Sequence, residues 1–282
     1  MTSCFFVSDL HGKINRYQKL LALIEDEKPD AIFFGGDLLP HVMMSHSLYD
    51  DFANDYFFPQ LRLLRQSLKE KYPDIFLILG NDDARIEEDN FEAAANEGLF
   101  FYVNQRWIEY RGFSIYGYSF IPPSPFGFKD WEKYDVSRYV DPGCTHPTEG
   151  TRSVEAPRHI EFQTIEKDLK ALAGDKDMSR ALMLFHSPPY NTCLDRAALD
   201  GMMIDHVPLD PHVGSIAIQR FIEERQPHLT LHGHIHESTR LTGKWMQKIK
   251  NTIAINAAHD GSELSVIKFK LENPGEASRF LY

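Results

Sequence analysis

Residues 229–236 read Leu-Thr-Leu-His-Gly-His-Ile-His, a short apolar run followed by three histidines. The run contains no charged residue and, like the other apolar runs of the chain, indicates a buried strand. Alternate residues of an extended segment point the same way, so we expect His234 and His236 to face one site. Imidazole is a common metal ligand, and a His-x-His pair is a stronger metal signal than a lone histidine.

Four other apolar runs end in the same way, each followed by side chains that can bind a metal. The runs span residues 4–7, 31–34, 75–79 and 181–185, and the side chains after them are Asp9 and His11, Asp37, Asn81, and His186. In open α/β sheets the crevice beyond the carboxyl ends of the strands is the usual ligand site. Seven oxygen and nitrogen donors at one such edge satisfy the needs of a two-metal centre.

Each motif taken alone also has an ordinary structural explanation. Asp9 after a strand is typical of a helix cap, and Gly36-Asp37 is typical of a turn. A lone histidine such as His186 is more often a hydrogen-bonded core residue than a ligand. Because five such motifs occur in order at predicted strand ends, the metal interpretation is favoured.

The rest of the chain alternates between predicted strands and helices, which indicates the α/β class with buried, mostly mixed sheets. Amphipathic stretches predict helices at residues 14–27, 58–71, 86–96, 158–173 and 215–225. Residues 264–270 alternate in polarity and predict an edge or half-exposed strand. Residues 102–110 and 113–118 flank Arg111-Gly112 and predict a hairpin.

Two proline-rich segments, residues 121–157 and 187–212, interrupt this alternation. Long irregular loops often carry function, so we interpret both as candidates for substrate contact. The first contains aromatic residues that are expected to stack on an organic leaving group, with packing of the loop onto the domain as the alternative. These residues are Phe126, Phe128, Trp131, Tyr134 and Tyr139.

The composition excludes several classes of protein. The 282 residues are 43% hydrophobic and carry a net charge of −11, which argues against a disordered chain and against general nucleic-acid binding. Three widely spaced cysteines predict neither a disulfide framework nor a thiolate metal site, and they fit a reducing compartment. No apolar run approaches the roughly 18 residues of a membrane span or forms a signal peptide, so no membrane association and a cytoplasmic location are expected.

The five motifs resemble those of the calcineurin-like metallophosphoesterase superfamily, whose pattern is Asp-x-His, Gly-Asp, Gly-Asn-His-Asp/Glu, a lone His and Gly-His-x-His. Here they stand as Asp9-Leu10-His11, Gly36-Asp37, Gly80-Asn81-Asp82-Asp83, His186 and Gly233-His234-Ile235-His236. The resemblance implies a four-layer α/β/β/α sandwich with two packed, mostly mixed β-sheets. It also implies a single domain over residues 1–282, with irregular insertions around 121–157 and 187–212.

The resemblance further implies a division of the ligands between two divalent ions. Asp9, His11 and His236 would hold one ion, Asn81, His186 and His234 would hold the other, and Asp37 would bridge them. The implied activity is hydrolysis of phosphodiesters or activated phosphomonoesters, in which a hydroxide bridging the ions attacks phosphorus. The mixed nitrogen and oxygen ligands without thiolate suit Mn²⁺, which we favour, as well as Fe, Zn²⁺ or Ni²⁺, and disfavour Ca²⁺, which prefers oxygen ligands. The expected partner is a small phosphorylated substrate.

The chain departs from the family pattern at Asp82, where the superfamily usually has the histidine that protonates the leaving group. Asp82 is therefore the candidate catalytic residue, and two nearby cations are expected to lower its pKa. If protonation comes from elsewhere, His41, His212 and His232 are the next candidates. The departure also leaves a non-catalytic metal-binding scaffold as the alternative function. A metallo-β-lactamase-type hydrolase would need an early His-x-His-x-Asp-His cluster, which is absent.

His212 is the candidate substrate-binding residue. It precedes the predicted helix at residues 215–225, whose first backbone N–H groups could bind a phosphate. Capping of that helix by Ser215 is the equally weighted alternative. The remaining histidines, His46 among them, belong to no motif and are interpreted as surface residues or residues behind the ligands.

Overall fold

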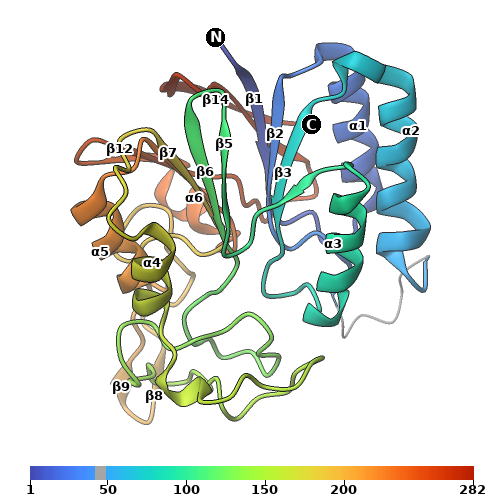
Figure 1. The fold of residues 1–282 in the computed structure, drawn as a ribbon. Coiled ribbons are helices and arrows are strands. Elements are labelled where there is room, and N and C mark those ends of the chain that lie inside the picture. The colour runs from blue at the N-terminus through green and yellow to red at the C-terminus, as the bar shows by residue number, and fades with distance from the viewer. Residues whose placement is uncertain (42–48) are drawn as a thin grey trace.

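Two mixed sheets pack face to face, with helices on their outer sides (Figure 1). The computed structural model describes residues 1–41 and 49–282, and His46 lies outside the described residues. The first sheet has the order β14-β13-β1-β2-β3-β4 and the second the order β11-β12-β10-β7-β6-β5. Each contains parallel and antiparallel pairs. The expected α/β class and the sandwich of two mixed sheets are confirmed.

The strands of the described chain are short. The first sheet holds β1 (Ser3–Val7), β2 (Ala31–Gly35), β3 (Asp74–Ile78), β4 (Phe101–Tyr102), β13 (Ser265–Lys270) and β14 (Asn273–Leu281). The second holds β5 (Trp107–Tyr110), β6 (Phe113–Tyr118), β7 (Ala181–Phe185), β10 (Leu229–His232), β11 (Met246–Ile249) and β12 (Thr252–Asn256). A separate hairpin pairs β8 (Met203–Ile204) with β9 (Val207–Pro208).

The described chain contains six α-helices. They are α1 (Ile14–Glu27), α2 (Phe58–Leu68), α3 (Glu88–Asn96), α4 (Ile165–Ala173), α5 (Ile216–Arg225) and α6 (Ser238–Thr242). In Figure 1, α1, α2 and α3 lie beside the first sheet, and α4 and α5 lie beside the second. A π-helical turn, Ala53–Phe57, precedes α2, and 3-10 turns lie at Lys69–Lys71, Arg85–Glu87 and Ile160–Phe162.

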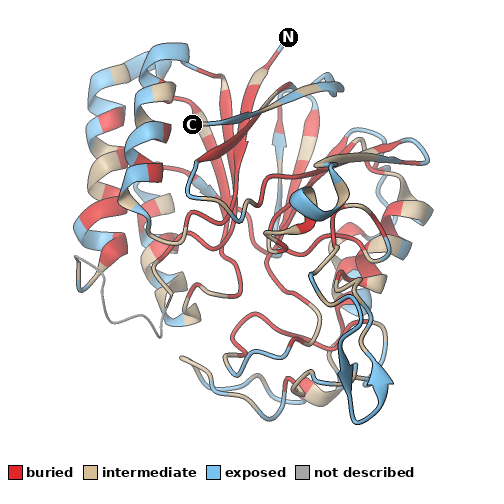
Figure 2. Cartoon of the chain, turned by 180° about the vertical axis from the view of Figure 1, so that it is seen from behind, coloured by how far each residue is buried: buried red, intermediate tan, exposed pale blue. Residues whose placement is uncertain are grey.

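Strand alternation divides the apolar side chains between two cores. In β1, Phe5 and Val7 belong to the core that the sheets form with the helices. Cys4 and Phe6 belong to the second core, which contains residues of both sheets and therefore lies between them. Figure 2 shows the central strands buried and the outer faces of the helices exposed. Because both strand faces are covered, these runs are apolar throughout instead of alternating.

Several predicted elements need correction. Residues 264–270 do not form an edge strand, because β14 pairs with the outer side of β13. Only part of the 102–110 segment enters the expected hairpin: β5 and β6 pair around Arg111-Gly112, whereas Tyr102 belongs to β4 in the other sheet. The helix expected at 158–173 begins at Ile165, because the Thr164 side chain accepts a hydrogen bond from the Lys167 N–H and caps it.

Residues 121–157 contain no helix or regular strand and are held together by buried polar contacts instead. Lys129 Nζ lies 2.6 Å from Glu132 Oε2, and both side chains are completely buried. Lys129 also donates to the Ser124 carbonyl, and Glu132 accepts from the Ser124 backbone N–H. A buried ion pair needs such additional hydrogen bonds to offset its loss of hydration.

No helix in the described part of the chain combines the length and the apolar character needed to cross a lipid bilayer.

Candidate metal centre

The candidate ligands lie where strands of both sheets end. Asp9, Asp37 and Asn81 follow the parallel strands β1, β2 and β3 of the first sheet. His186, His234 and His236 follow β7 and β10, which are parallel neighbours in the second sheet. The carboxyl ends of parallel strands share one sheet edge, so the facing sheets bring both sets together.

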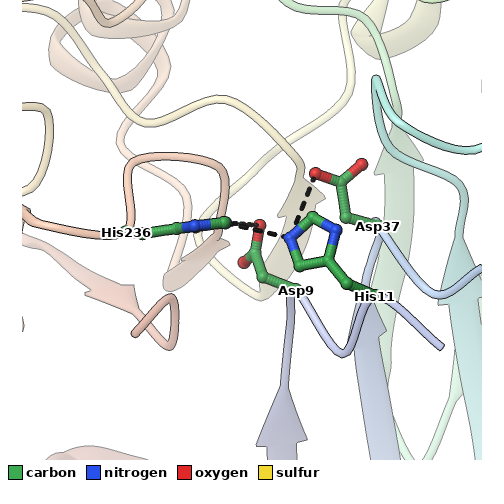
Figure 3. Close-up of side chains that lie close together, drawn as sticks. All are labelled: Asp9, His11, Asp37 and His236. Atoms are coloured by element: carbon green, nitrogen blue, oxygen red, sulfur yellow. Dashed lines mark hydrogen bonds and ion pairs between the residues drawn. The ribbon is translucent and has the colours of Figure 1, made fainter. Parts of the chain in front are cut away.

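One group of donors consists of Asp9, His11, Asp37 and His236 (Figure 3), whose ligand atoms all lie within 4.8 Å of one another. His236 Nε2 lies 3.1 Å from Asp9 Oδ1 and 3.1 Å from His11 Nε2. Two atoms that bind one ion at right angles, each about 2.1 Å away, are about 3 Å apart. The spacing of these three atoms therefore fits a shared cation.

A second group consists of Asp37, His186 and His234, within the same 4.8 Å limit. Asn81 Oδ1 lies 2.9 Å from His186 Nε2 and so adjoins this group. Asp37 belongs to both groups: its Oδ2 lies 3.4 Å from His186 Nε2 and 3.9 Å from His11 Nε2. The structure thus brings all seven candidate ligands together, with one carboxylate between the two sets.

Four of the candidate ligands adopt the left-handed backbone conformation in the loops that carry them. Asp9, His11, Asp37 and His234 have φ values of 58°, 49°, 53° and 71°. Such values are uncommon for residues other than glycine and cluster at functional sites. Backbone hydrogen bonds hold the conformation, since Asp9 N–H donates to the Gly36 carbonyl and His11 N–H donates to the Asp37 carbonyl.

Gly80 allows the first and second sheets to approach closely at the centre. A Cβ atom at this position would lie 2.3 Å from Asp37 Oδ1 and 2.6 Å from His186 Cε1. Both distances are far shorter than a van der Waals contact, so the added Cβ would displace Asp37 and His186 unless the Gly80 backbone itself shifted.

We therefore expect Gly80→Ala to weaken metal binding by about 10- to 100-fold, as found when residues that orient metal ligands are changed. Isothermal titration calorimetry with Mn²⁺ measures the metal affinity of the variant. Gly127→Ala is the matched control, because a Cβ there would meet no atom within 4 Å. Unchanged Mn²⁺ affinity in Gly80→Ala would contradict the proposed crowding.

The electrostatics of the centre favour positive charge. Burial opposes ionisation of Asp9, but its hydrogen bond and attraction to His236 lower the pKa of Asp9 to about 2. The pKa of Asp37 is also lowered, by His186 and His11, against the same burial. In turn, burial would lower the pKa of His186, yet Asp37 raises it to about 10. Two buried carboxylates thus hold a proton on a buried imidazole, and a cation could take its place.

Contacts behind the donors fix their orientation. His186 Nδ1 donates to the Gly35 carbonyl at 2.7 Å, which leaves Nε2 facing the centre. Arg16, which is buried, donates from Nη1 to the Asp9 carbonyl at 2.7 Å. These bonds restrict ring and loop positions before any ion is bound.

The sequence interpretation missed the role of Asp83. Its buried carboxylate accepts hydrogen bonds from the backbone N–H groups of Leu38, Leu39 and Gly80. The loops that carry Asp37 and Asn81 are therefore tied together by one side chain. The available signal was the second aspartate of Asn81-Asp82-Asp83, a charged residue directly after a predicted buried strand.

Asp82 lies between two histidines. Its Oδ2 is 3.5 Å from His11 Nδ1, and its Oδ1 is 3.6 Å from His41 Nε2. In the protein without metal ions, burial and then the charge of Asp37 raise the pKa of Asp82 to about 8. The lowering of this pKa that the sequence predicts would require bound cations beside the carboxylate. Among the alternative proton donors, His41 is the one beside Asp82.

The other two alternative donors are engaged elsewhere. His232 is buried, with Nδ1 2.9 Å from the Ser187 carbonyl, Nε2 2.8 Å from the Thr230 hydroxyl, and its ring stacked on Phe185. His212 Nδ1 lies 2.8 Å from Asp195 Oδ1, and His212 belongs to neither donor group.

The start of α5 is not open to a phosphate. Its first N–H groups donate to a carboxylate of the chain itself, since those of Ile216 and Ala217 bind Asp135. Ser215 Oγ accepts from the Ile218 N–H, as a helix cap does. The capping interpretation of Ser215 is confirmed, and the phosphate interpretation of this helix start is wrong because Asp135 already occupies it.

The five aromatic residues of segment 121–157 that were predicted to stack differ in burial, and Phe128 is half-buried. Trp131 and Tyr134 are fully buried, and Trp131 Nε1 donates to the Asp83 carbonyl at 2.8 Å. They pack the segment onto the domain, so the expected stacking on a leaving group is wrong for these two. Phe126 and Tyr139 are 53% and 69% exposed and remain accessible.

Comparison with known proteins identifies a family and shows the same fold. The family model described as calcineurin-like phosphoesterase matches residues 3–238. An uncharacterized protein of Methanocaldococcus jannaschii is 36% identical over 83 residues. That match covers 29% of this chain and 32% of the relative's length.

Solved structures with low sequence identity share the architecture. The protein TT1561 of Thermus thermophilus superimposes with a TM-score of 0.56 at 18% identity, covering 99% of this chain and 98% of the other. A structure described as a dimetal phosphatase from Danio rerio gives 0.52 at 11% identity, covering 94% and 92%. At these identities the likeness concerns the fold.

Proposed function

The chain belongs to the calcineurin-like phosphoesterase family, and from this membership and the geometry of its centre we propose that it hydrolyses phosphodiesters or activated phosphomonoesters with two divalent ions. The observation that carries the proposal is the position of Asp37 in both donor groups. A carboxylate has two oxygens and can serve two cations about 3.5–4 Å apart.

The residues present fit such a pair of ions. Asp9, His11 and His236 would hold one and Asn81, His186 and His234 the other, with Asp37 shared. The donors are nitrogen and oxygen atoms without thiolate, which suits Mn²⁺ first and also Fe, Zn²⁺ or Ni²⁺. Held there, divalent ions would supply Lewis acidity toward a phosphoryl group and would activate water near neutral pH.

The chain's own groups would position the substrate and handle protons. Asp9 and Asp37 are buried and their lowered pKa values favour the carboxylate form, so they concentrate negative charge at the ions. We propose that Asp82 orients the imidazole of His41, which stands at its Oδ1, so that the ring delivers a proton to the leaving group.

Asp82→His should change the dependence of the rate on the leaving group. Aryl and phosphoanhydride leaving groups depart with little proton assistance, so the wild type, whose proposed donor His41 lies outside the usual family position, should prefer them to alkyl esters. A histidine at position 82 places an acid near the working pH in the usual family position and should speed alkyl esters by about 10²-fold or more. Rates on phosphodiesters with graded leaving-group pKa measure the effect.

His41→Gln tests the proposed proton donor on the same series of phosphodiesters. This variant should slow hydrolysis of alkyl esters more than hydrolysis of aryl esters. His159→Gln, at a ring whose side chain is 80% exposed, is the control and should leave every rate unchanged. Equal effects of Asp82→His across the whole series would show that protonation does not depend on this pair.

The decisive experiment for the activity itself is a panel of substrates screened against metals. Bis- and mono-p-nitrophenyl phosphate, cyclic nucleotides and nucleotide diphosphates would each be tested with Mn²⁺, Fe²⁺, Zn²⁺ and Ni²⁺. We expect turnover of a diester or an activated monoester, highest with Mn²⁺. Bound metal without turnover of any substrate would favour the non-catalytic scaffold.

A further inference from the structure

A cavity of about 390 Å³ lies between the two irregular segments, and no candidate metal ligand lines it. One wall belongs to residues 121–157 and the other to residues 187–216, where β8 and β9 form an exposed hairpin. The walls are mainly apolar, with Pro122, Pro125 and Val140 on one side and Leu199, Met202 and Leu209 on the other. The volume falls within the range of small-molecule sites, about 300–1,000 Å³.

The charged groups of the cavity are carboxylates. Asp135, Asp141 and Asp210 line it, and neither lysine nor arginine occurs among its described lining residues. Asp135 is already engaged by the Ser215 hydroxyl and the first N–H groups of α5. The uncompensated charges are therefore those of Asp141 and Asp210.

The lining histidine does not cancel these charges. His212 Nδ1 is bonded to Asp195 Oδ1, and Asp195 has no exposed surface. Asp210 accepts from the Tyr190 hydroxyl at 2.7 Å and from the His212 backbone N–H at 2.8 Å, and both of these donors are uncharged. Burial, and then Asp210, raise the pKa of Asp141, so a nearby positive charge would stabilise its ionised form.

We propose that this cavity binds a small organic cation, with its ammonium group beside Asp141 and Asp210 and its apolar body between the two walls. The rings of Tyr139 and Tyr190 also line the cavity, and aromatic faces attract ammonium groups. A phosphate or carboxylate would find no positive side chain there to offset the two carboxylates. The cavity would therefore take an organic cation, whereas the metal-loaded centre would take an anionic phosphate, and the two share no candidate metal ligand.

Calorimetric titration of the full chain with three matched probes tests the proposal. The probes are 2-phenylethylammonium, 2-phenylethanol and phenylacetate, which share an apolar body and differ in charge. We expect the cation to bind at least about tenfold more tightly than the neutral alcohol, and the anion to show no binding. Equal binding of cation and alcohol, or no binding of the cation, would overturn the proposal.

Variants of residues that line the cavity test whether the cation binds there. Asp141→Asn and Asp210→Asn should each weaken binding of 2-phenylethylammonium by about tenfold, whereas Asp205→Asn, on the exposed β8–β9 turn, should leave it unchanged. Leu199→Trp should abolish binding by filling the cavity. Circular dichroism checks each fold, and the three probes on the wild type remain decisive if a variant does not fold. Unchanged binding in all folded cavity variants would refute the assignment.

Discussion

Asp37→Asn is expected to reduce turnover more than any other single change at the centre. The substitution keeps the shape of the side chain but removes the one charge shared by both donor groups, so both ions should be held less tightly. We expect kcat/KM to fall by at least about 10²-fold, beyond the 10–100-fold typical of residues that only orient a ligand. Activity on the best substrate and metal content by mass spectrometry measure the two effects together.

His11→Ala and Asp175→Asn are the comparisons. His11 belongs to one donor group only, so its loss should weaken one ion and spare the other. Asp175 is exposed in the loop after α4, and its change should alter neither metal content nor rate. If Asp37→Asn retains two ions and near-normal turnover, the shared carboxylate is assigned wrongly.

Lys129→Met is expected to destabilise the protein by about 3–5 kcal/mol, the usual cost of removing one partner from a buried ion pair. Glu132 would remain completely buried without its counter-charge, which now lies 2.6 Å away. Even beside Lys129, burial raises the pKa of Glu132 from 4.5 to about 7. Urea unfolding near neutral pH measures the loss.

The double variant Lys129→Met with Glu132→Gln should recover a large part of this stability, since it removes both charges and keeps an acceptor for Ser124. Lys170→Met, on the exposed face of α4, is the control.

The contribution of Glu132 to stability depends on pH with a definite sign. The folded state binds the Glu132 proton more tightly than the unfolded state, so this group's contribution to stability falls as pH rises from about 5 to about 7. A loss below about 1 kcal/mol in Lys129→Met would mean that the pair is not buried in solution.

Much of the fold follows from the sequence because its central strands are apolar on both faces. The runs at 4–7, 31–34 and 181–185 each became a strand with bounds shifted by at most one residue. The helix at 14–27 has the predicted bounds, because Tyr17, Leu20 and Ile24 share the one buried face that its periodicity requires. Local pattern and tertiary burial agree in these elements.

The errors occur where tertiary contacts override the local pattern. β14 contains proline, glycine and glutamate and has one exposed face, so it has no apolar run to reveal it. Its presence is what turns the alternating 264–270 segment into an interior strand. Tyr102 pairs with β3 in the first sheet, although the segment around it predicts a hairpin. No local rule specifies which sheet a short strand joins.

The sequence predicts more of the candidate centre than of the loops that surround it. The ligand types and their positions after strands identify seven residues that the fold then gathers, because parallel strands share an edge. The contacts of Asp83 and Asp135 were not predicted because each side chain acts on a segment distant in sequence, loop 37–39 for Asp83 and the start of α5 for Asp135. Such pairings depend on the closed tertiary structure.

The distance along the chain between Asp9 and His236 has a consequence for synthesis on the ribosome. These contacting residues are 227 positions apart, and every candidate ligand of the second sheet comes from β7 or later. At about 5–20 residues per second, translation needs roughly 11–45 s to pass from one to the other. During that interval the nascent chain carries the carboxylates of the first sheet without their histidine partners. Binding of a metal by the complete set of candidate ligands would therefore have to follow synthesis of the ligand-bearing strands of both sheets.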